Sequence, residues 1–273
     1  MSARSSIETE IQRIRARISE ILSASDNSPS ARRSLDKELR EIASEVEAAL
    51  AKIDPVSLPD SVFDPSNPKI IGRFTALALV AQKLLPLSQI GRFYGSGVYA
   101  IYYTGDFPLY APISKTESPI YVGQAAPKLR NAVNPRDQGP RLTDRLGEHR
   151  KNIEKASTTL NIGDFYARFL VVQSGWETAA EDYLIQLFRP IWNSETKVLF
   201  GLGKHGDDAV TRANKRSPWD TIHPGRKWAE ASKEDSKTVA EIELGLDAHF
   251  SLHPAYQRQT DLLDTFISEL RQG

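Results

Sequence analysis

Two tyrosines, an arginine, a histidine and a glutamate of this chain are spaced in a way that allows hydrolysis of a phosphodiester. Tyr99 and Tyr121 lie in two β-prone runs, Arg145 and His149 are one helical turn apart, and Glu181 lies in a later helical run. Cleavage of a phosphodiester requires a base to activate water, a cation to offset charge on the phosphate and a route for the leaving oxygen. These side chains provide a candidate for each requirement.

Tyr99 is the candidate for taking the proton from water. The pKa of a free tyrosine is near 10, about three units too high for neutral pH, so the phenol needs roughly 4 kcal/mol of help. A nearby guanidinium and a metal ion can lower the pKa of a phenol in a partly desolvated site. His149 is the natural relay, which either accepts the phenolic proton or acts on the water directly. Packing of Tyr99 in the core is the alternative without chemistry.

Arg141, Arg145 and His149 follow each other at four-residue intervals, so they share one face of a helix. Three potential phosphate contacts then point the same way. Arg145 is expected to hold the scissile phosphate with two hydrogen bonds, a geometry that lysine lacks. The alternative is an exposed helix face on which Asp144 and Glu148 balance the charge.

Glu181 lies at the border of the apolar stripe of its helix, where a carboxylate needs a partner. Mg²⁺ accepts one carboxylate together with waters and phosphate oxygens, so a single glutamate is sufficient. We therefore expect Glu181 to hold one Mg²⁺, for which Mn²⁺ can substitute. Glu177 and Asp182 are competing ligands, and a salt bridge from Glu181 to Arg168 or Arg189 is the structural alternative. Asn193 could orient Glu181 or bind a phosphate, although an Asn in a loop is more often a turn former.

A segment from Phe200 to Trp228 combines glycines, basic residues and tryptophans, as expected of loops that contact DNA. Arginine is the usual reader of guanine edges. The candidates for reading the sequence or gripping the backbone are Lys204, Arg216, His223 and Arg226, together with Arg141 on the helix face. The run from His223 to Arg226 could equally be a structural turn that seats Trp228.

The distribution of charge supports a polyanionic partner although the formal net charge is zero. Residues 124–155 carry eight Lys or Arg against four Asp or Glu, and residues 197–227 carry seven against three. The stretch from Trp228 to the end has nine acidic residues against four basic ones. Its negative charge offsets the positive charge of the two basic stretches in the net sum.

The composition excludes several classes of protein. The chain contains no Cys, which rules out disulfides and thiolate metal sites such as zinc fingers. A hydrophobic content of 40% in 273 residues supports a real core. No apolar run reaches the length of a membrane span, and no secretory signal is recognisable at the start. We therefore expect a globular protein of the cytoplasm.

The elements that must position the candidate residues follow from the hydrophobic periodicity. Residues 97–103, 119–123 and 165–172 are predicted strands, and residues 74–85, 140–156 and 176–188 are predicted helices. The order of these elements predicts an α+β fold with a small, mainly antiparallel sheet of about three strands flanked by helices.

The N-terminal part predicts a helical hairpin. Ile7, Ile11, Ile14, Ile18 and Ile21 step by four and three, and a second helix repeats that spacing. The seam could pack within the hairpin or against another subunit. Four prolines in residues 54–68 place a domain boundary there. The predicted segments are residues 1–54 for the hairpin, 55–92 for a linker and short helix, 93–230 for the nuclease domain and 231–273 for a helical tail.

The tripeptides Gly97-Val98-Tyr99 and Tyr121-Val122-Gly123 resemble the paired motifs of the GIY-YIG nuclease family. Arg145, His149, Glu181 and Asn193 follow in the order that the family shows on corresponding elements. The insert between the motifs, a His at 149 and the segment 200–228 look closest to the type II restriction branch that cuts the palindrome CCGCGG. The resemblance covers roughly residues 92–230, and it implies a metal-dependent double-strand endonuclease that acts on DNA as a homodimer.

Three other functions remain open at the level of sequence. The chain could be a GIY-YIG nuclease that nicks one strand in repair or in transfer of mobile elements. It could be a DNA-binding module without catalysis, although all six expected side chains are present. The helical N-terminus could also belong to an interaction protein with an unrelated α+β domain.

Overall fold

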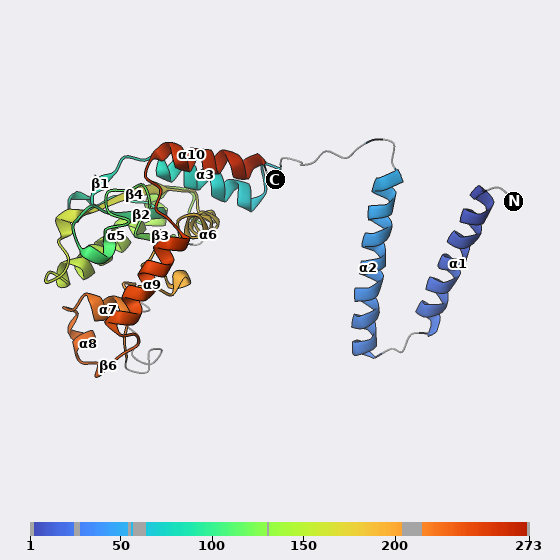
Figure 1. The fold of residues 1–273 in the computed structure, drawn as a ribbon. Coiled ribbons are helices and arrows are strands. Elements are labelled where there is room, and N and C mark those ends of the chain that lie inside the picture. Colours follow the sequence, from blue (N-terminus) through green and yellow to red (C-terminus); the bar gives the residue numbers. More distant parts are fainter. Residues whose placement is uncertain are drawn as a thin grey trace. The chain divides into compact units, whose positions relative to one another are not determined.

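The structure of the chain is a computed structural model, shown as a ribbon in Figure 1. It describes residues 3–24, 28–53, 56, 64–129, 131–203 and 215–271. The chain divides into two compact units, Met1–Val62 and Phe63–Gly273. The predicted limits of the four segments stay predictions.

The first unit contains two long helices, α1 (Ala3–Ala24) and α2 (Pro29–Ile53). Apolar residues of the predicted seams remain largely exposed, among them Ile14 at 57% and Val46 at 52%. The choice between a hairpin contact and a subunit contact therefore stays open.

The second unit is built on a four-stranded antiparallel sheet with the order β1-β4-β2-β3. Its central strand β2 (Gly97–Tyr103) pairs with β3 (Tyr121–Ala125) on one side and with β4 (Phe165–Val171) on the other. All seven residues of β2 are buried, because helices or loops cover both faces of the sheet. The two-residue strand β1 (Leu85–Pro86) adds an edge.

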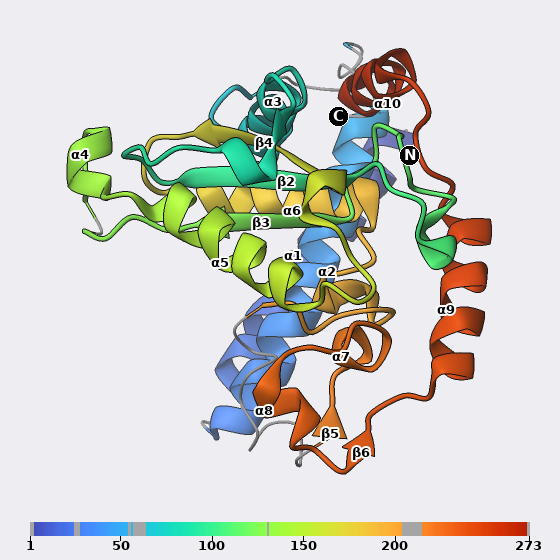
Figure 2. The ribbon, with the colours of Figure 1, turned by 90° about the vertical axis from the view of Figure 1, so that its left-hand side faces the viewer.

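Alternate residues of β2 belong to two separate cores, as the two-residue period of a strand requires. One face carries Tyr99, Ile101 and Tyr103, which pack with α5 (Arg141–Lys155). The other face packs with three helices, namely α3 (Pro68–Val80), α6 (Glu177–Phe188) and α10 (Gln259–Arg271). Figure 2 shows α3 and α5 on opposite sides of the sheet. The predicted α+β class with a small antiparallel sheet is confirmed.

The remaining elements are short, apart from one helix near the C-terminus. They are α4 (Pro135–Gln138), α7 (Pro218–Ile222), α8 (Lys227–Glu230), α9 (Val239–Leu252), β5 (Lys215–Arg216), β6 (Glu234–Asp235), and the 3₁₀ helices η1 (Leu87–Gln89), η2 (Pro108–Tyr110), η3 (Ile162–Asp164) and η4 (Ser194–Thr196). Among the described helices, none combines the length and the apolar character that crossing a bilayer requires.

The structure corrects two helix limits. The helix predicted over 74–85 begins earlier, because the Asn67 side chain accepts a hydrogen bond from the backbone N–H of Lys69 and Pro68 occupies the first turn. It ends at Val80, and Pro86 lies in β1, an edge strand that tolerates proline. The tail predicted as helical over residues 231–273 contains two helices, α9 and α10, separated at Pro254.

Candidate active site

The pairing of β2 with β3 brings the two motif tyrosines to one edge of the sheet. Tyr99 is opposite Gly123, and Tyr121 is opposite Ile101, so both phenols extend over the face that α5 covers. The missing side chain of Gly123 makes room for this arrangement. A Cβ at position 123 would lie 2.6 Å from the hydroxyl of Tyr99 and 2.9 Å from the ring of Tyr121. The motif glycine is thus explained by the close approach of a phenol.

Helix α5 places His149 against Tyr99. The Tyr99 hydroxyl lies 2.7 Å from Nε2 of His149, and both residues are almost completely buried, with exposed fractions of 0% and 1%. The His149 ring also lies beside the ring of Tyr121, at 4.7 Å between centroids. His149 shares the inner stripe of α5 with Leu142, Leu146 and Ile153, which fixes the imidazole in the core. The predicted relay pair is therefore in contact.

Burial holds both members of this pair in their neutral forms. It raises the pKa of Tyr99 well above its ordinary value, Tyr121 raises it further, and Arg145 opposes the rise. Burial and the charge of Arg145 lower the pKa of His149 to about 3. At neutral pH the phenol keeps its proton and the imidazole is uncharged. Proton transfer between them requires additional charge, which a bound substrate or metal ion can bring.

Arg145 lies at the same site and is partly exposed. Its charge lowers the pKa of both Tyr99 and Tyr121, which places the guanidinium close to the two phenols. One Nη of Arg145 donates to Glu148 at 2.6 Å, so the balancing carboxylate considered from the sequence is present. Because this ion pair is exposed on the Glu148 side, at 54%, a phosphate can compete for the guanidinium.

Glu181 reaches the site from α6, near the edge strand β3. Burial raises the pKa of its carboxyl to about 7, hydrogen bonds from Gln124 lower it, and the charges of Glu195 and Asp182 raise it. In the described part of the chain Glu181 forms no ion pair, since Arg168 pairs instead with Glu117 at 2.9 Å. Such a carboxylate, partly desolvated and close to other acids, favours a cation.

Glu177 has a different role from the one considered for it. Its carboxylate accepts hydrogen bonds from the Ser96 hydroxyl at 3.0 Å and from the backbone N–H of Gly175 at 2.7 Å. Glu177 is buried at an exposed fraction of 4%, and it joins the start of β2 to the start of α6. Glu177 therefore supports the frame of the site, while Glu181 remains the candidate ligand.

The residues present fit one divalent ion held by a single protein carboxylate. No group of three His, Asp or Glu side chains that could enclose a metal occurs among the described residues. Mg²⁺ does not need such a cage, because waters and phosphate oxygens complete its coordination. In the described segments no protein cation pairs with Glu181, which is consistent with binding of a divalent ion by this carboxylate.

Asn193 contacts neither Glu181 nor an open surface. Its Oδ1 accepts a hydrogen bond from the backbone N–H of Val122 at 3.0 Å, and its Nδ2 donates to the carbonyl of Val122 at 2.9 Å. With an exposed fraction of 5%, Asn193 fastens β3 directly beside Tyr121. This position corrects the expectation that it orients Glu181 or binds a phosphate.

Two of the predicted DNA contacts are buried. His223 is completely buried, and its ring nitrogens pair with the hydroxyls of Tyr110 and Thr159. Arg226 has an exposed fraction of 1% and forms a two-point ion pair with Asp220. DNA cannot reach either side chain in this structure. The alternative in which this run is a structural turn describes them instead, with Arg226 stacked on Trp228.

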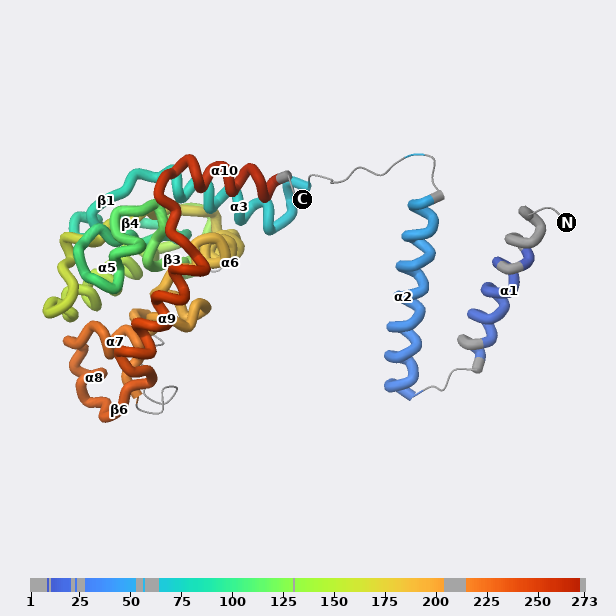
Figure 3. Tube along the Cα trace, in the orientation of Figure 1, coloured from blue at the N-terminus to red at the C-terminus, as the bar shows by residue number. Residues whose placement is uncertain are grey.

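The other predicted DNA contacts differ in their surroundings. Arg216 forms a two-point ion pair with Asp235 at 2.7 and 3.1 Å between β5 and β6, so it holds this pair of strands together. Arg141 uses Nε to donate to the carbonyl of Ala126 and lines a surface pocket beside α5. Lys204 lies outside the described residues, in a segment drawn in grey in Figure 3.

Two residues at the site, Gln124 and Glu195, were not identified from the sequence, and Gly123 was noted there only as part of a motif. Gly123 makes room for Tyr99, Gln124 hydrogen-bonds Glu181, and Glu195 influences the pKa of both Glu181 and Tyr121. The alternation of a strand could have indicated Gln124, because it shares with Val122 the face that packs on α6. Glu195 lies in η4, and its spacing from Glu181 carries no periodic signal.

Comparison with known families agrees with this geometry. A family model described as the Eco29kI GIY-YIG domain matches residues 91–250, more than half of the 273-residue chain. A search of curated proteins finds no match.

Proposed function

The chain belongs to the Eco29kI GIY-YIG family of restriction endonucleases, and on that premise we propose that it is a type II enzyme cutting both strands of DNA at CCGCGG. The observation that carries the proposal is the meeting of Tyr99, Tyr121, Arg145, His149 and Glu181 at the β3 edge of the sheet. The CCGCGG target rests on the resemblance to the restriction branch and on the matched domain.

The two phenols and His149 form the route for the proton of the attacking water. Tyr121 is partly exposed and lies beside the buried Tyr99, whose hydroxyl contacts His149. The water approaches the phenols from the open side, and its proton reaches Nε2 of His149 through Tyr99. Direct action of His149 on the water is less favourable here, because its Nε2 is occupied by the Tyr99 hydroxyl.

Arg145 and a metal ion held by Glu181 offset the negative charge of the phosphate. Arg145 exchanges its exposed partner Glu148 for the scissile phosphate, to which a guanidinium can donate two parallel hydrogen bonds. Glu181 would hold a divalent ion such as Mg²⁺, with Mn²⁺ as a substitute. When bound, that ion would supply positive charge that polarises the phosphate. Ionisation of Glu181 is required first, because burial raises its pKa to about 7.

A palindromic target calls for a protein with two-fold symmetry, so the proposal includes a homodimer on DNA. Asn193 keeps a supporting role, since it fixes the backbone next to Tyr121. Arg141, half-buried at the start of α5, Arg216 and Lys204 remain the proposed contacts to DNA, whereas His223 and Arg226 are withdrawn from that role.

The test is to incubate the full chain with plasmid DNA and Mg²⁺ and to sequence the ends. We expect double-strand ends within CCGCGG, and random ends or intact plasmid would contradict the proposal. The variant Glu181→Gln should abolish cleavage while DNA binding is largely retained. Asp182→Asn, one residue along the same helix, is the matched control and should cut normally. Near wild-type cutting by Glu181→Gln would remove Glu181 from the metal role.

A further inference from the structure

His149 lines a small pocket that the proposed reaction does not use. The pocket has a volume of about 230 Å³ and lies between α5 and the backbone of Leu202 and Gly203. Arg145 lies at the same pocket and links it to the active site. Tyr99, which contacts Nε2 of His149, is not among the lining residues. The pocket therefore touches His149 without touching the phenol.

One ring nitrogen of His149, which lines this pocket, lacks a partner among the described residues. Nδ1 of His149 is buried and makes no hydrogen bond to any residue that the structure describes. To accept the proton of Tyr99, Nε2 must be unprotonated, and the single proton of the neutral ring is then on Nδ1. A buried N–H without an acceptor is unfavourable. The pocket therefore calls for an occupant that carries a hydrogen-bond acceptor.

The charges around the pocket favour an anionic acceptor. Lys151 and Lys155 line it together with Arg145, against one carboxylate, that of Glu148. With a neutral His149 these four side chains sum to a charge of +2. Both lysines are exposed, so their ammonium groups can approach a bound anion without breaking an ion pair that the described residues form. A phosphate diester matches this combination of acceptor oxygens and negative charge.

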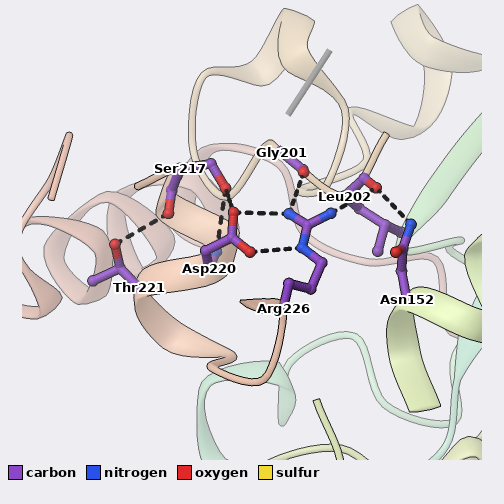
Figure 4. A network of polar contacts seen from close by, with 7 residues as sticks. All are labelled: Asn152, Gly201, Leu202, Ser217, Asp220, Thr221 and Arg226. Atoms are coloured by element: carbon purple, nitrogen blue, oxygen red, sulfur yellow. Dashed lines mark hydrogen bonds and ion pairs between the residues drawn. The ribbon is translucent and has the colours of Figure 1, made fainter. Parts of the chain in front are cut away.

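The opposite wall of the pocket is held rigidly. The Arg226 guanidinium donates to the carbonyls of Gly201 and Leu202 at 2.7 and 3.3 Å, while Asp220 binds it at 2.6 and 2.8 Å (Figure 4). Nδ2 of Asn152 on α5 donates to the same Leu202 carbonyl at 3.2 Å. This network joins the wall to the helix that carries His149.

A close contact between Gly225 and the end of α5 holds the same wall of the pocket in place. Gly225 has a φ of +134° and lies against the end of α5, where a Cβ would meet the carbonyl of Lys155 at 1.9 Å. A side chain at position 225 would push the Arg226 turn away from the helix. The pocket is thus a built feature of the fold: Asn152 joins its wall to α5, and Arg226, which is paired with the buried Asp220, holds the same wall by its carbonyls.

We propose that this pocket is a subsite for a DNA backbone phosphate that is not cleaved, and that an oxygen of this phosphate accepts the hydrogen bond from Nδ1 of His149. The inference rests on the proposed function. During the reaction the O–H bond of Tyr99 breaks and an N–H bond forms at Nε2. The phosphate in the subsite stays a diester and stabilises the resulting imidazolium, as the carboxylate does in a Ser-His-Asp triad. Correctly bound DNA thereby completes the relay.

The test observes the imidazole directly, in the full chain labelled with ¹⁵N-histidine and without metal. The sequence has five histidines, so His149→Gln assigns the resonance. We expect inorganic phosphate and a CCGCGG duplex each to shift the Nδ1 signal in a saturable manner. Lys155→Ala should weaken this response at least about tenfold. Arg150→Ala is the matched control, because Arg150 is on the same helix but does not line the pocket.

The outcomes separate the subsite from the nuclease activity. An unchanged His149 signal with saturating duplex, or an equal response in Lys155→Ala, overturns the subsite even if the protein cuts DNA normally. A phosphate-dependent shift that Lys155→Ala removes supports the subsite even if no plasmid is cleaved, in which case the proposed function alone fails. Duplexes with one neutral methylphosphonate should also reveal a single non-scissile position at which cleavage is slow in the wild type and unaffected in Lys155→Ala.

Discussion

Among the described residues, two buried tyrosine–histidine pairs lie in one core, and they differ in whether every hydrogen-bonding group has a partner. In one pair Tyr99 lies 2.7 Å from His149, and in the other Tyr110 lies 2.5 Å from His223. Burial lowers the pKa of both histidines to about 3. By residue type, distance and burial the two pairs are nearly equivalent.

We call the Tyr110 pair closed, because each of its hydrogen-bonding groups has a partner in the protein. The indole N–H of Trp192 donates to the Tyr110 hydroxyl at 2.9 Å, and the other ring nitrogen of His223 lies 2.8 Å from the hydroxyl of Thr159. The Thr159 hydroxyl in turn donates to the carbonyl of Ala156. Every polar group in this row has a partner, so the row stabilises the fold and has no place for a substrate.

We call the Tyr99 pair open, because groups that a ligand can contact lie at the phenol and at the imidazole. Tyr121 and Arg145 lie next to the phenol, and Nδ1 of His149 is without a partner among the described residues. The comparison shows that a tyrosine–histidine contact does not by itself indicate catalysis. What distinguishes the reactive pair is the nearby charge and the hydrogen-bonding group left for a ligand.

Removing each phenol in turn should separate the two pairs most clearly. Tyr99→Phe takes away the proton path, so we expect cleavage to slow by roughly 10²–10⁴-fold. It also removes the hydrogen bond to Nε2 of the buried His149, which should lower the free energy of unfolding by about 1 kcal/mol. Tyr110→Phe should leave cleavage close to wild type but lower the free energy of unfolding by about 1–3 kcal/mol, because the buried Trp192 N–H and Nε2 of His223 both lose their partner. Cleavage assays and urea unfolding measure the two effects. The reverse pattern would exchange the roles of the pairs.

The two arginines beside these pairs should differ in the same way. Arg145→Ala removes a partly exposed cation at the active site, so cleavage should slow by roughly 10²-fold or more at little cost in stability. Arg226→Ala leaves Asp220 buried without its partner, and the free energy of unfolding should fall by about 3–5 kcal/mol. A stable Arg226→Ala protein with weak DNA binding would restore Arg226 as a DNA contact.

The smallest effect should come from the charge of Glu181 on stability. Burial raises the pKa of this carboxyl from 4.5 to about 7, so the folded state binds the proton more tightly than the unfolded state. Stability is then lost as pH rises from 4.5 to 7 and stays lower above that range. Without metal, Glu181→Gln should match the wild type at pH 4 and exceed it at pH 8 by on the order of 1 kcal/mol. Thermal unfolding at both pH values checks this, and equal stabilities at pH 8 would contradict it.

The sequence predicted which strands and helices carry the reactive residues. It predicted the first and last residues of these elements less well. The strand 97–103 follows from a run of β-prone residues, which is buried on both faces, and the Arg145–His149 face of α5 follows from helical periodicity. The second strand was placed two residues too early, and β1 was missed. A two-residue edge strand has no periodic signal, and it exists only because β4 offers free backbone groups.

The assignments of basic residues show where reasoning from sequence ends. His223 and Arg226 lie in a basic, aromatic segment that resembles a DNA-contacting loop, yet both are buried. Composition records that a charge is present but not whether a carboxylate neutralises it. For Arg226 that carboxylate is Asp220, brought into place by the helix α7 and the turn that follows it.

The sequence by itself determined which residue types can do the chemistry and on which elements they lie, because side-chain periodicity and the order of strands and helices are local properties. Only the tertiary structure decided which tyrosine–histidine pair is open. That difference depends on Thr159 reaching His223 while the described residues leave Nδ1 of His149 unpaired, and both result from contacts between segments far apart in the chain. Local sequence sets the candidates, and long-range packing sets what each of them can bind.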